Sequence, residues 1–219
     1  MGKETEFRFL TLEDVVTKGK TVFVRVDINS PLDPLSRRII DDTRIRMTRE
    51  TLDWLKDAKV VLGSHHGRPG DDDFTSLVAH ASLLQKYVSQ RVKFVEDTIG
   101  PEARNQIKNL NVGEILVLDN LRLCSEEGLS ASADVLAKTI MVQRLARSVD
   151  VYVNDAFATA HRAQASIVGL PRLVPAVAGK LMAKELHALR EAYYQPHRPS
   201  VYVIGGGKAD DKLPIIDNI

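Results

Sequence analysis

Short apolar runs, each followed by polar residues and turn-formers, recur along this 219-residue chain. Residues 21–29 (TVFVRVDIN) alternate so that Val22, Val24 and Val26 share one face, which predicts a strand. Polar residues follow each of the further apolar runs, so the strands are expected to end at loops rich in functional groups. The further predicted strands are residues 60–63, 92–95, 114–118, 151–153 and 201–204.

Segments with helical periodicity separate these runs. Ile45, Leu52 and Leu55 lie on one stripe and predict a helix from about residue 43 to 58. Alternating strands and helices predict an α/β fold with three layers, in which helices cover both faces of a mostly parallel sheet. Residues 156–174 are predicted to be largely loop. Further helices are predicted after Ser76, from Pro101 onward, and over residues 132–149 and 182–194.

The polar residues that follow the strands are expected to meet. Carboxyl ends of parallel strands lie on one edge of a sheet, where open α/β folds bind their ligands. A basic loop such as residues 64–70 could by itself be a solvated surface turn, but the shared edge favours a ligand site. The residues concerned are Asp27 and Asn29, His65 and Arg68, Asn120 and Arg122, and Asn154 and Asp155.

Four arginines make this edge suited to a small polyanion. Arg44 opens a helix, where the helix dipole disfavours a cation unless an anion compensates it. Arg68 and Arg122 follow strands, and Arg162 lies in the loop after residues 154–155. Guanidinium groups bind carboxylate and phosphate through paired hydrogen bonds. We therefore expect a ligand with both kinds of anionic group, and Asp27 and Asn29 could orient a hydroxyl between them.

The composition narrows the possible partners, the cellular location and the types of site. The formal net charge of +1 does not indicate a nucleic-acid partner or a membrane surface. One cysteine, Cys124, excludes an internal disulfide, and it is interpreted as buried filler. Without a signal peptide or an apolar run of membrane-spanning length, a cytoplasmic location is expected. The common phosphate-binding glycine motifs are absent, the histidines fit no usual metal ligand set, and Arg25 is interpreted as a paired core arginine.

The motifs together resemble those of the phosphoglycerate kinase family. They occur in order and at fitting intervals over nearly the whole chain, and the wording of residues 27–34 and 67–77 looks most like the archaeal branch. The sequence departs from the family pattern at His66, where Leu or Gln is usual, at Asp119 and at Ala158. The matching motifs are RVDINSPLD (25–33), DDTRIR (41–46), SHHGRPG (64–70), DNLR (119–122), VNDAFATAHRAQAS (153–166), AGKLMAKEL (178–186) and GGGKADDKLPIIDN (205–218).

This resemblance implies a transferase that moves a phosphoryl group between ATP and the carboxylate of 3-phosphoglycerate. It implies Mg-ATP or Mg-ADP as cofactor, no metal site in this chain, and catalytic roles for Arg44, Lys208 and Lys212. Lys208 and Lys212 are also implied to contact ATP phosphates. The implied substrate-binding residues are Asp27, Ile28, Asn29, Arg44, His65, His66, Gly67, Arg68, Arg122 and Arg162.

The family is bilobal, so the resemblance also implies domain boundaries. Residues 1–178 would form the lobe that binds 3-phosphoglycerate, 179–199 an interdomain helix and hinge, and 200–219 the truncated start of the ATP lobe. The 219-residue chain alone is then expected to bind its small-molecule substrate as a monomer and to be inactive. The alternative is a non-catalytic module that binds phosphoglycerate or a similar anion. A role in binding nucleic acid is disfavoured.

Overall fold

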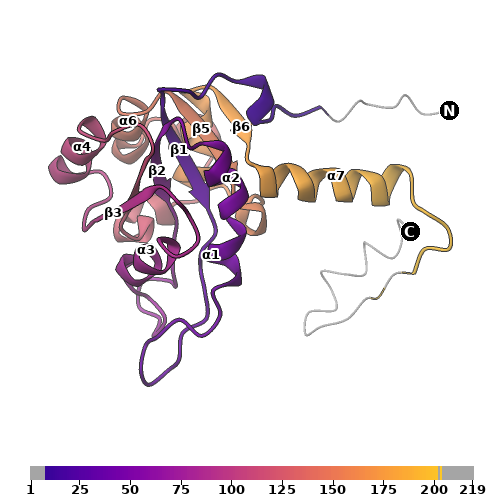
Figure 1. Cartoon of the computed structure of the whole chain (residues 1–219), viewed down its shortest axis with the longest axis horizontal. Coiled ribbons are helices and arrows are strands. Elements are labelled where there is room, and N and C mark those ends of the chain that lie inside the picture. The colour runs from indigo at the N-terminus through magenta and orange to yellow at the C-terminus, as the bar shows by residue number, and fades with distance from the viewer. Residues whose placement is uncertain (1–7, 202, 204–219) are drawn as a thin grey trace. The chain divides into compact units, whose positions relative to one another are not determined.

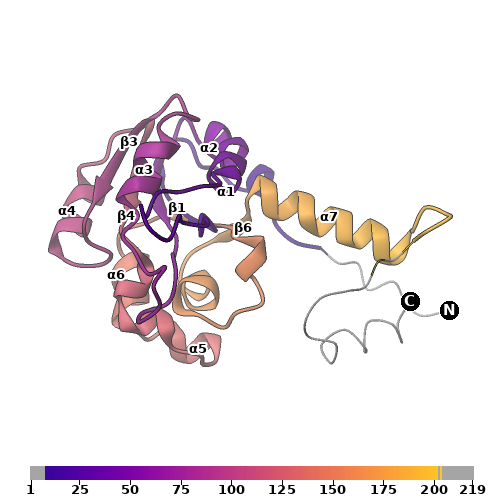
Figure 2. The same ribbon diagram turned by 90° about the horizontal axis from the view of Figure 1, so that it is seen from below.

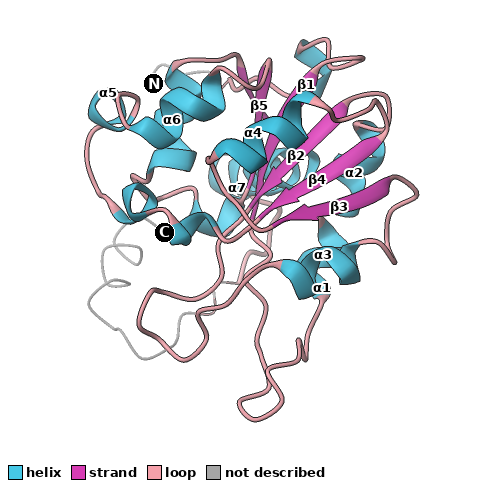
Figure 3. Ribbon diagram, turned by 90° about the vertical axis from the view of Figure 1, so that its left-hand side faces the viewer, coloured by secondary structure: helices cyan, strands magenta, loops and turns pink. Residues whose placement is uncertain are grey.

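A computed structural model describes residues 8–201 and residue 203 of the chain. Residues 202 and 204 of the predicted strand 201–204 lie outside the described residues, as do the candidate residues Lys208 and Lys212. A six-stranded sheet in the order β3-β4-β2-β1-β5-β6 forms the centre, and all its strands are parallel. Figure 3 shows the strands from β3 to β5 side by side. The predicted α/β class and parallel sheet are thus confirmed. The strands are β1 (Thr21–Val26), β2 (Lys59–Gly63), β3 (Arg91–Val95), β4 (Glu114–Leu118), β5 (Val151–Asp155) and β6 (Ala176–Ala178).

Helices cover both faces of the sheet, as predicted. Figure 2 shows α1, α2 and α3 on one side of the strands and α5 and α6 on the other, and Figure 1 gives the order along the chain. The alternation in β1 fits these layers, because Val22 and Val24 pack in one core cluster and Phe23 in the other. The helices are α1 (Thr43–Met47), α2 (Arg49–Trp54), α3 (Val78–Leu84), α4 (Pro101–Lys108), α5 (Ala133–Leu136), α6 (Ile140–Ala146) and α7 (Lys180–Tyr194).

Two predicted helices are shorter and more broken than their periodicity suggested. The helix predicted over 43–58 is interrupted at Thr48, whose hydroxyl donates to the carbonyl of Ile45 at 2.7 Å, and it ends at Trp54. A threonine hydroxyl that bonds backward along a helix competes with the regular ladder. The helix predicted over 132–149 breaks at Thr139, which has an extended backbone (ψ 151°) and caps α6.

The stretch predicted to be loop, residues 156–174, contains short helical turns, and strand β6 follows it. Sequence reasoning missed β6, whose three residues carry no alternation and pair with β5 from Tyr152–Ala176 onward. A π-helical turn over Ala165–Gly169 places Ser166 in the interior. Other short helical turns are Leu12–Asp14, Leu121–Leu123, Ser125–Gly128, Phe157–Thr159 and Leu170–Arg172.

The strand order creates a place for a ligand. After β1 the chain adds β2 beside it, forms β3 at the edge and then places β4 between β2 and β3, before it crosses back to add β5 and β6 on the other side of β1. The loops that leave β2 and β4 therefore lie on one side of β1, and the loop that leaves β5 lies on the other. Such a reversal opens a crevice at the carboxyl ends of the strands.

The chain divides into two compact units, residues 1–186 and 187–219, with the division inside α7. The first unit contains the whole sheet. The described part of the second holds the rest of α7 and an ion pair at 2.8 Å between His197 and Glu191. In the described part of the chain, no helix is both long and apolar enough to cross a membrane.

Arg25 is a paired core arginine, as predicted. It has no solvent-exposed surface, and its Nη2 lies 3.6 Å from Oε1 of the equally buried Glu127. Its Nε donates to Ser166 Oγ at 2.8 Å, and Ser166 in turn donates its hydroxyl and its backbone N–H to the Glu127 carboxylate. The buried charges therefore have partners, and the loop after β4 and the turn after β5 are bound to β1.

Replacing one buried charge tests this arrangement. Glu127→Gln leaves the Arg25 guanidinium buried without a counter-charge, so we expect the free energy of unfolding to fall by about 3–5 kcal/mol. Urea unfolding followed by circular dichroism measures the change. Asp134→Asn is the matched control, because it removes an exposed ion pair with Arg172 and should cost less than about 1 kcal/mol. Equal losses in both variants would contradict a structural role for the buried pair.

Candidate anion-binding site

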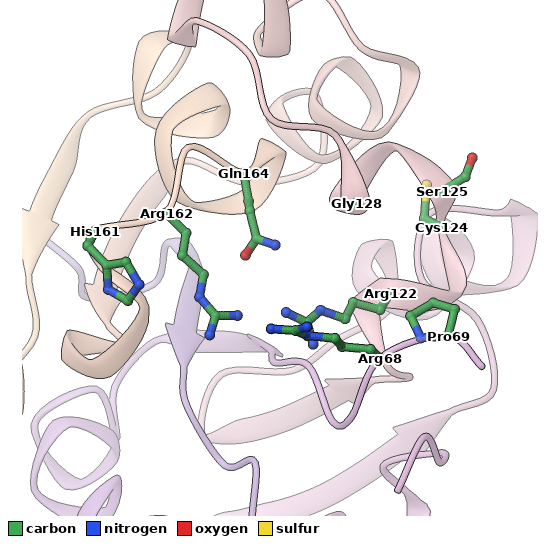
Figure 4. A pocket seen from close by; sticks show the side chains of 9 residues that line it. All are labelled: Arg68, Pro69, Arg122, Cys124, Ser125, Gly128, His161, Arg162 and Gln164. Carbon is green, nitrogen blue, oxygen red and sulfur yellow. The ribbon is translucent and has the colours of Figure 1, made fainter. Parts of the chain in front are cut away.

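A pocket of about 670 Å³ opens at the carboxyl edge of the sheet. Arg68 comes from the loop after β2, Arg122 from the turn after β4, and His161 and Arg162 from the segment after β5. Figure 4 shows the guanidinium groups of Arg68 and Arg122 side by side, with Arg162 opposite them. The structure thus brings together three of the four arginines that the sequence placed at this edge. The remaining lining residues are Pro69, Cys124, Ser125, Gly128 and Gln164.

The pocket concentrates positive charge that is not neutralised by ion pairs within the described part of the chain. Within residues 8–201 and 203, none of Arg68, Arg122 and Arg162 forms a salt bridge with a carboxylate. Burial, followed by the neighbouring charge of Arg162, lowers the pKa of Arg122. Guanidinium groups that repel one another in a partly desolvated pocket favour an anionic ligand with several oxygen atoms.

A chain of hydrogen bonds connects this pocket to the other predicted site residues. Arg44 donates to Asp27 Oδ2 at 2.5 Å, and Asp27 Oδ1 accepts from the backbone N–H of Asn29 at 3.1 Å. The side-chain oxygen of Asn29 accepts from the Gly67 N–H at 3.3 Å, and Arg122 donates to the Gly67 carbonyl. Segments that are distant in sequence are therefore linked from Arg44 to the pocket wall.

The Asp27 carboxylate pairs with Arg44 and compensates its charge at the start of α1. A cation in the first turn of α1 needs a compensating anion, and the Asp27 carboxylate supplies one inside the protein. The Arg44 side chain keeps 47% of its exposure, so it remains accessible beside the edge. Arg44, Asp27 and Asn29 are not among the residues that line the pocket described above. Ile28 is buried, and its backbone N–H donates to Ser64 Oγ at 3.2 Å.

His65 is held as a neutral imidazole. Burial, followed by the charges of Arg25, Arg122 and Arg162, lowers its pKa to about 2. Arg25 Nη2 lies 3.2 Å from His65 Nδ1, and a guanidinium can only donate. Nδ1 is therefore the acceptor, and the single proton of the neutral ring is on Nε2. The ring can offer one N–H donor but adds no charge.

His66 and Gly67 shape the loop that carries Arg68. Gly67 has φ +61°, and a Cβ there would lie 2.6 Å from the backbone N of Phe74, so only glycine fits. His66 is buried, and both ring nitrogens face backbone carbonyls. Asn120, also fully buried, donates to the His66 carbonyl and accepts from its N–H. The His66 side chain is thus placed within the protein and outside the pocket wall.

Several site residues were not found from the sequence. Gln164 and Ser125 line the pocket but belong to no pattern that distinguishes them from other polar loop residues. Cys124 is half-buried and lines the pocket, so its interpretation as buried filler is wrong. A charged residue inside an apolar strand does signal a buried partner, but nothing in the sequence identifies Glu127. The part of the chain that the structure describes contains no group of three or more residues suited to hold a metal.

These observations define an α/β protein with a polycationic pocket at the carboxyl edge of a parallel sheet. The sequence model of one family, phosphoglycerate kinase, matches residues 12–219. The chain belongs to the phosphoglycerate kinase family.

Individual relatives agree with this assignment. The chain is 44% identical over 221 residues to the phosphoglycerate kinase of Sulfurisphaera tokodaii, covering 100% of the chain and 53% of that protein. It is 46% identical to that of Methanothermobacter thermautotrophicus, covering 97% and 52%. The crystal structure of phosphoglycerate kinase from Pyrococcus horikoshii superposes with a TM-score of 0.90 at 42% identity, covering 95% of this chain and 51% of the other. The chain thus spans about half the length of the relatives it matches.

The lowered pKa of the buried His80 predicts how the free energy of unfolding depends on pH. Burial lowers the pKa of His80 from 6.5 to about 3, so between these values unfolding takes up a proton at this residue and acid favours the unfolded state. His80→Leu removes this uptake. We expect the slope of unfolding free energy against pH in this range to fall by about 1.4 kcal/mol per pH unit relative to wild type. Urea unfolding at pH 4–6 measures it. An unchanged slope would contradict a neutral, buried His80.

Proposed function

We propose that this chain forms the 3-phosphoglycerate-binding part of a phosphoglycerate kinase that transfers a phosphoryl group reversibly between ATP and the carboxylate of 3-phosphoglycerate. The observation that carries the proposal is the cluster of Arg68, Arg122 and Arg162 in one pocket without carboxylate partners among the described residues. A pocket of about 670 Å³ is within the range that binds small molecules. Membership of the family identifies the candidate anion.

The substrate has a phosphate at one end and a carboxylate at the other, and the site has matching parts. The three pocket arginines suit the phosphate, and His65 Nε2–H adds an uncharged donor. Asp27 and Asn29 lie further along the hydrogen-bonded chain, on the side that leads to Arg44. We assign them to the hydroxyl and carboxylate region of the substrate, with Gly67 and Ile28 contributing backbone geometry.

In the catalytic step, the carboxylate of 3-phosphoglycerate attacks the γ-phosphorus of ATP, an acyl phosphate forms, and ADP leaves. Mg-ATP, when bound, supplies the phosphoryl group and the metal that neutralises its charge. The residues of this chain contribute by positioning the substrate carboxylate and by offering positive charge. We assign Arg44 to the transferring group, and Lys208 and Lys212, which lie outside the described residues, to the phosphates of the nucleotide. We further propose a cytoplasmic, monomeric enzyme of glycolysis.

Arg68 provides the first test. Arg68→Ala should weaken 3-phosphoglycerate binding by about 1.5–3 kcal/mol, the range for a lost charge-assisted hydrogen bond. Arg68→Lys should restore only part of the loss, because an ammonium cannot form the paired bonds of a guanidinium. Isothermal titration calorimetry at low salt measures both. Arg49→Ala is the control, since Arg49 is exposed and pairs with Asp53 on α2. A flat titration of the folded wild-type chain would refute the site assignment.

A second test concerns turnover by the 219-residue polypeptide expressed alone. Its relatives are about twice as long, and a kinase must hold ATP in line with the substrate. Such orientation is worth about 7–11 kcal/mol of the barrier. A coupled assay should therefore detect no kinase activity above background while 3-phosphoglycerate still binds. Adding the remaining half of a relative in trans should restore turnover, whereas failure of every such complementation would favour the non-catalytic binding module.

A further inference from the structure

His66 connects two loops that border the pocket. Its Nε2 lies 2.7 Å from the carbonyl oxygen of Ser30, in the loop that follows Asn29. Its Nδ1 lies 2.8 Å from the carbonyl oxygen of Asp73, near the end of the loop that carries Arg68. One buried ring, only 1% exposed, therefore spans the two segments from which the proposed substrate groups project.

Each ring nitrogen of His66 lies within hydrogen-bonding distance of a backbone carbonyl. A carbonyl oxygen accepts hydrogen bonds and cannot donate one, so a ring nitrogen bonds to its carbonyl only when it carries a proton. The neutral imidazole has one N–H and can satisfy only one of the carbonyls. Whichever nitrogen carries the proton, the ring lies between the two carbonyls and donates to at least one of them. The ring forms no ion pair among the described residues, and the His80 ring packs against it at 4.8 Å between centroids.

Arg68 depends on this loop for its position. Within the described part of the chain, the Arg68 side chain forms no hydrogen bond and no ion pair. Its guanidinium is therefore placed by the backbone of residues 66–73. Side chains that bond to this backbone are those of His66, Asn120 and Arg122, the last donating to the Gly67 carbonyl. Arg37 also donates to the carbonyls of Asp72 and Phe74.

We infer that His66 is a positioning residue for substrate binding, which sets Arg68 and Asn29 at a fixed separation by holding the two loops through their backbone carbonyls. This inference rests on the proposed function. It assigns the His66 side chain a role without substrate contact, because the ring is buried and both of its nitrogens face backbone carbonyls. A leucine at this position would fill the space and leave the carbonyls of Ser30 and Asp73 without a donor from the ring.

His80 is a matched control. It is the same residue type, is equally buried at 1% exposure, and lies against the His66 ring, but neither of its ring nitrogens has a hydrogen-bond partner in the described structure. If burial of an imidazole were all that mattered, His66→Leu and His80→Leu would affect binding alike. If the bonds to the two carbonyls matter, only His66→Leu should.

Calorimetry on the 219-residue chain tests the inference. His66→Leu should weaken 3-phosphoglycerate binding by about tenfold, the equivalent of one or two lost hydrogen bonds, and His80→Leu by less than about twofold. His66→Gln keeps one donor group and should fall between wild type and His66→Leu. On an Arg68→Ala background, His66→Leu should have less than about a threefold effect, since the group it positions is gone. Equal effects in both backgrounds, or none in either, would overturn the inference.

Two further measurements keep the test decisive. Nitrogen-15 NMR of the wild-type His66 ring should show an N–H proton that is hydrogen-bonded and protected from exchange with water, and a ring whose protons exchange freely would overturn the arrangement without any variant. Amide hydrogen exchange of residues 67–73 should become faster in His66→Leu and stay unchanged in His80→Leu. If the wild type does not bind 3-phosphoglycerate but the exchange and NMR results hold, the proposed function fails while the loop connection stands. If the wild type binds 3-phosphoglycerate but the exchange and NMR results are not as expected, only the inference about His66 fails.

Discussion

A guanidinium without access to water lies in the central region of the sheet, and the site is built around it. Arg25 can occupy β1 only because Glu127, Ser166 and His65 reach it from three different connections. A buried charge left unpaired would cost several kcal/mol, so these connections cannot separate without a large penalty. The same contacts hold the segments that carry the pocket arginines. The need to pair the buried Arg25 charge thus fixes the positions of the segments that carry the pocket arginines.

The pocket illustrates how a nearly neutral protein presents a strongly basic surface. With a formal net charge of +1, the chain has no general excess of cations, yet three arginines share one pocket. Mutual repulsion would spread such groups apart if they were on flexible segments. Here the turn after β4 and the loop after β2 are bound to one another through Asn120, which spans the His66 carbonyl and that of Thr75. The scaffold therefore opposes the repulsion until an anion offsets it.

Backbone carbonyls are the points at which side chains restrain these loops. His66, Asn120, Arg37 and Arg122 each donate to a carbonyl on residues 66–75 or on the neighbouring loop. Irregular segments lack the internal ladder of a helix or strand, so their buried carbonyls need donors from elsewhere. A loop satisfied in this way can be rigid without regular secondary structure. Such rigidity lowers the entropy that ligand binding would otherwise have to overcome.

Local pattern determined the strands that are buried on both faces. Residues 114–118 form β4 to the residue as predicted, and the apolar run 115–118 is fully buried there. The helix boundaries were less accurate, since Thr48 and Thr139 make hydrogen bonds that periodicity does not register. Strand β6 was missed because three small residues become a strand only through the free edge of β5.

The sequence by itself determined the layers of the fold, the edge at which Arg68, Arg122 and Arg162 meet, and the family, because these follow from periodicity, parallel strands and ordered motifs. Tertiary structure alone decided that Glu127 balances Arg25, that Asp27 pairs with Arg44, and that His65 is neutral. The physical reason is range. Hydrophobic periodicity acts between neighbours in sequence, whereas charge pairing, desolvation and hydrogen bonding depend on which distant segments the completed fold brings within a few ångströms.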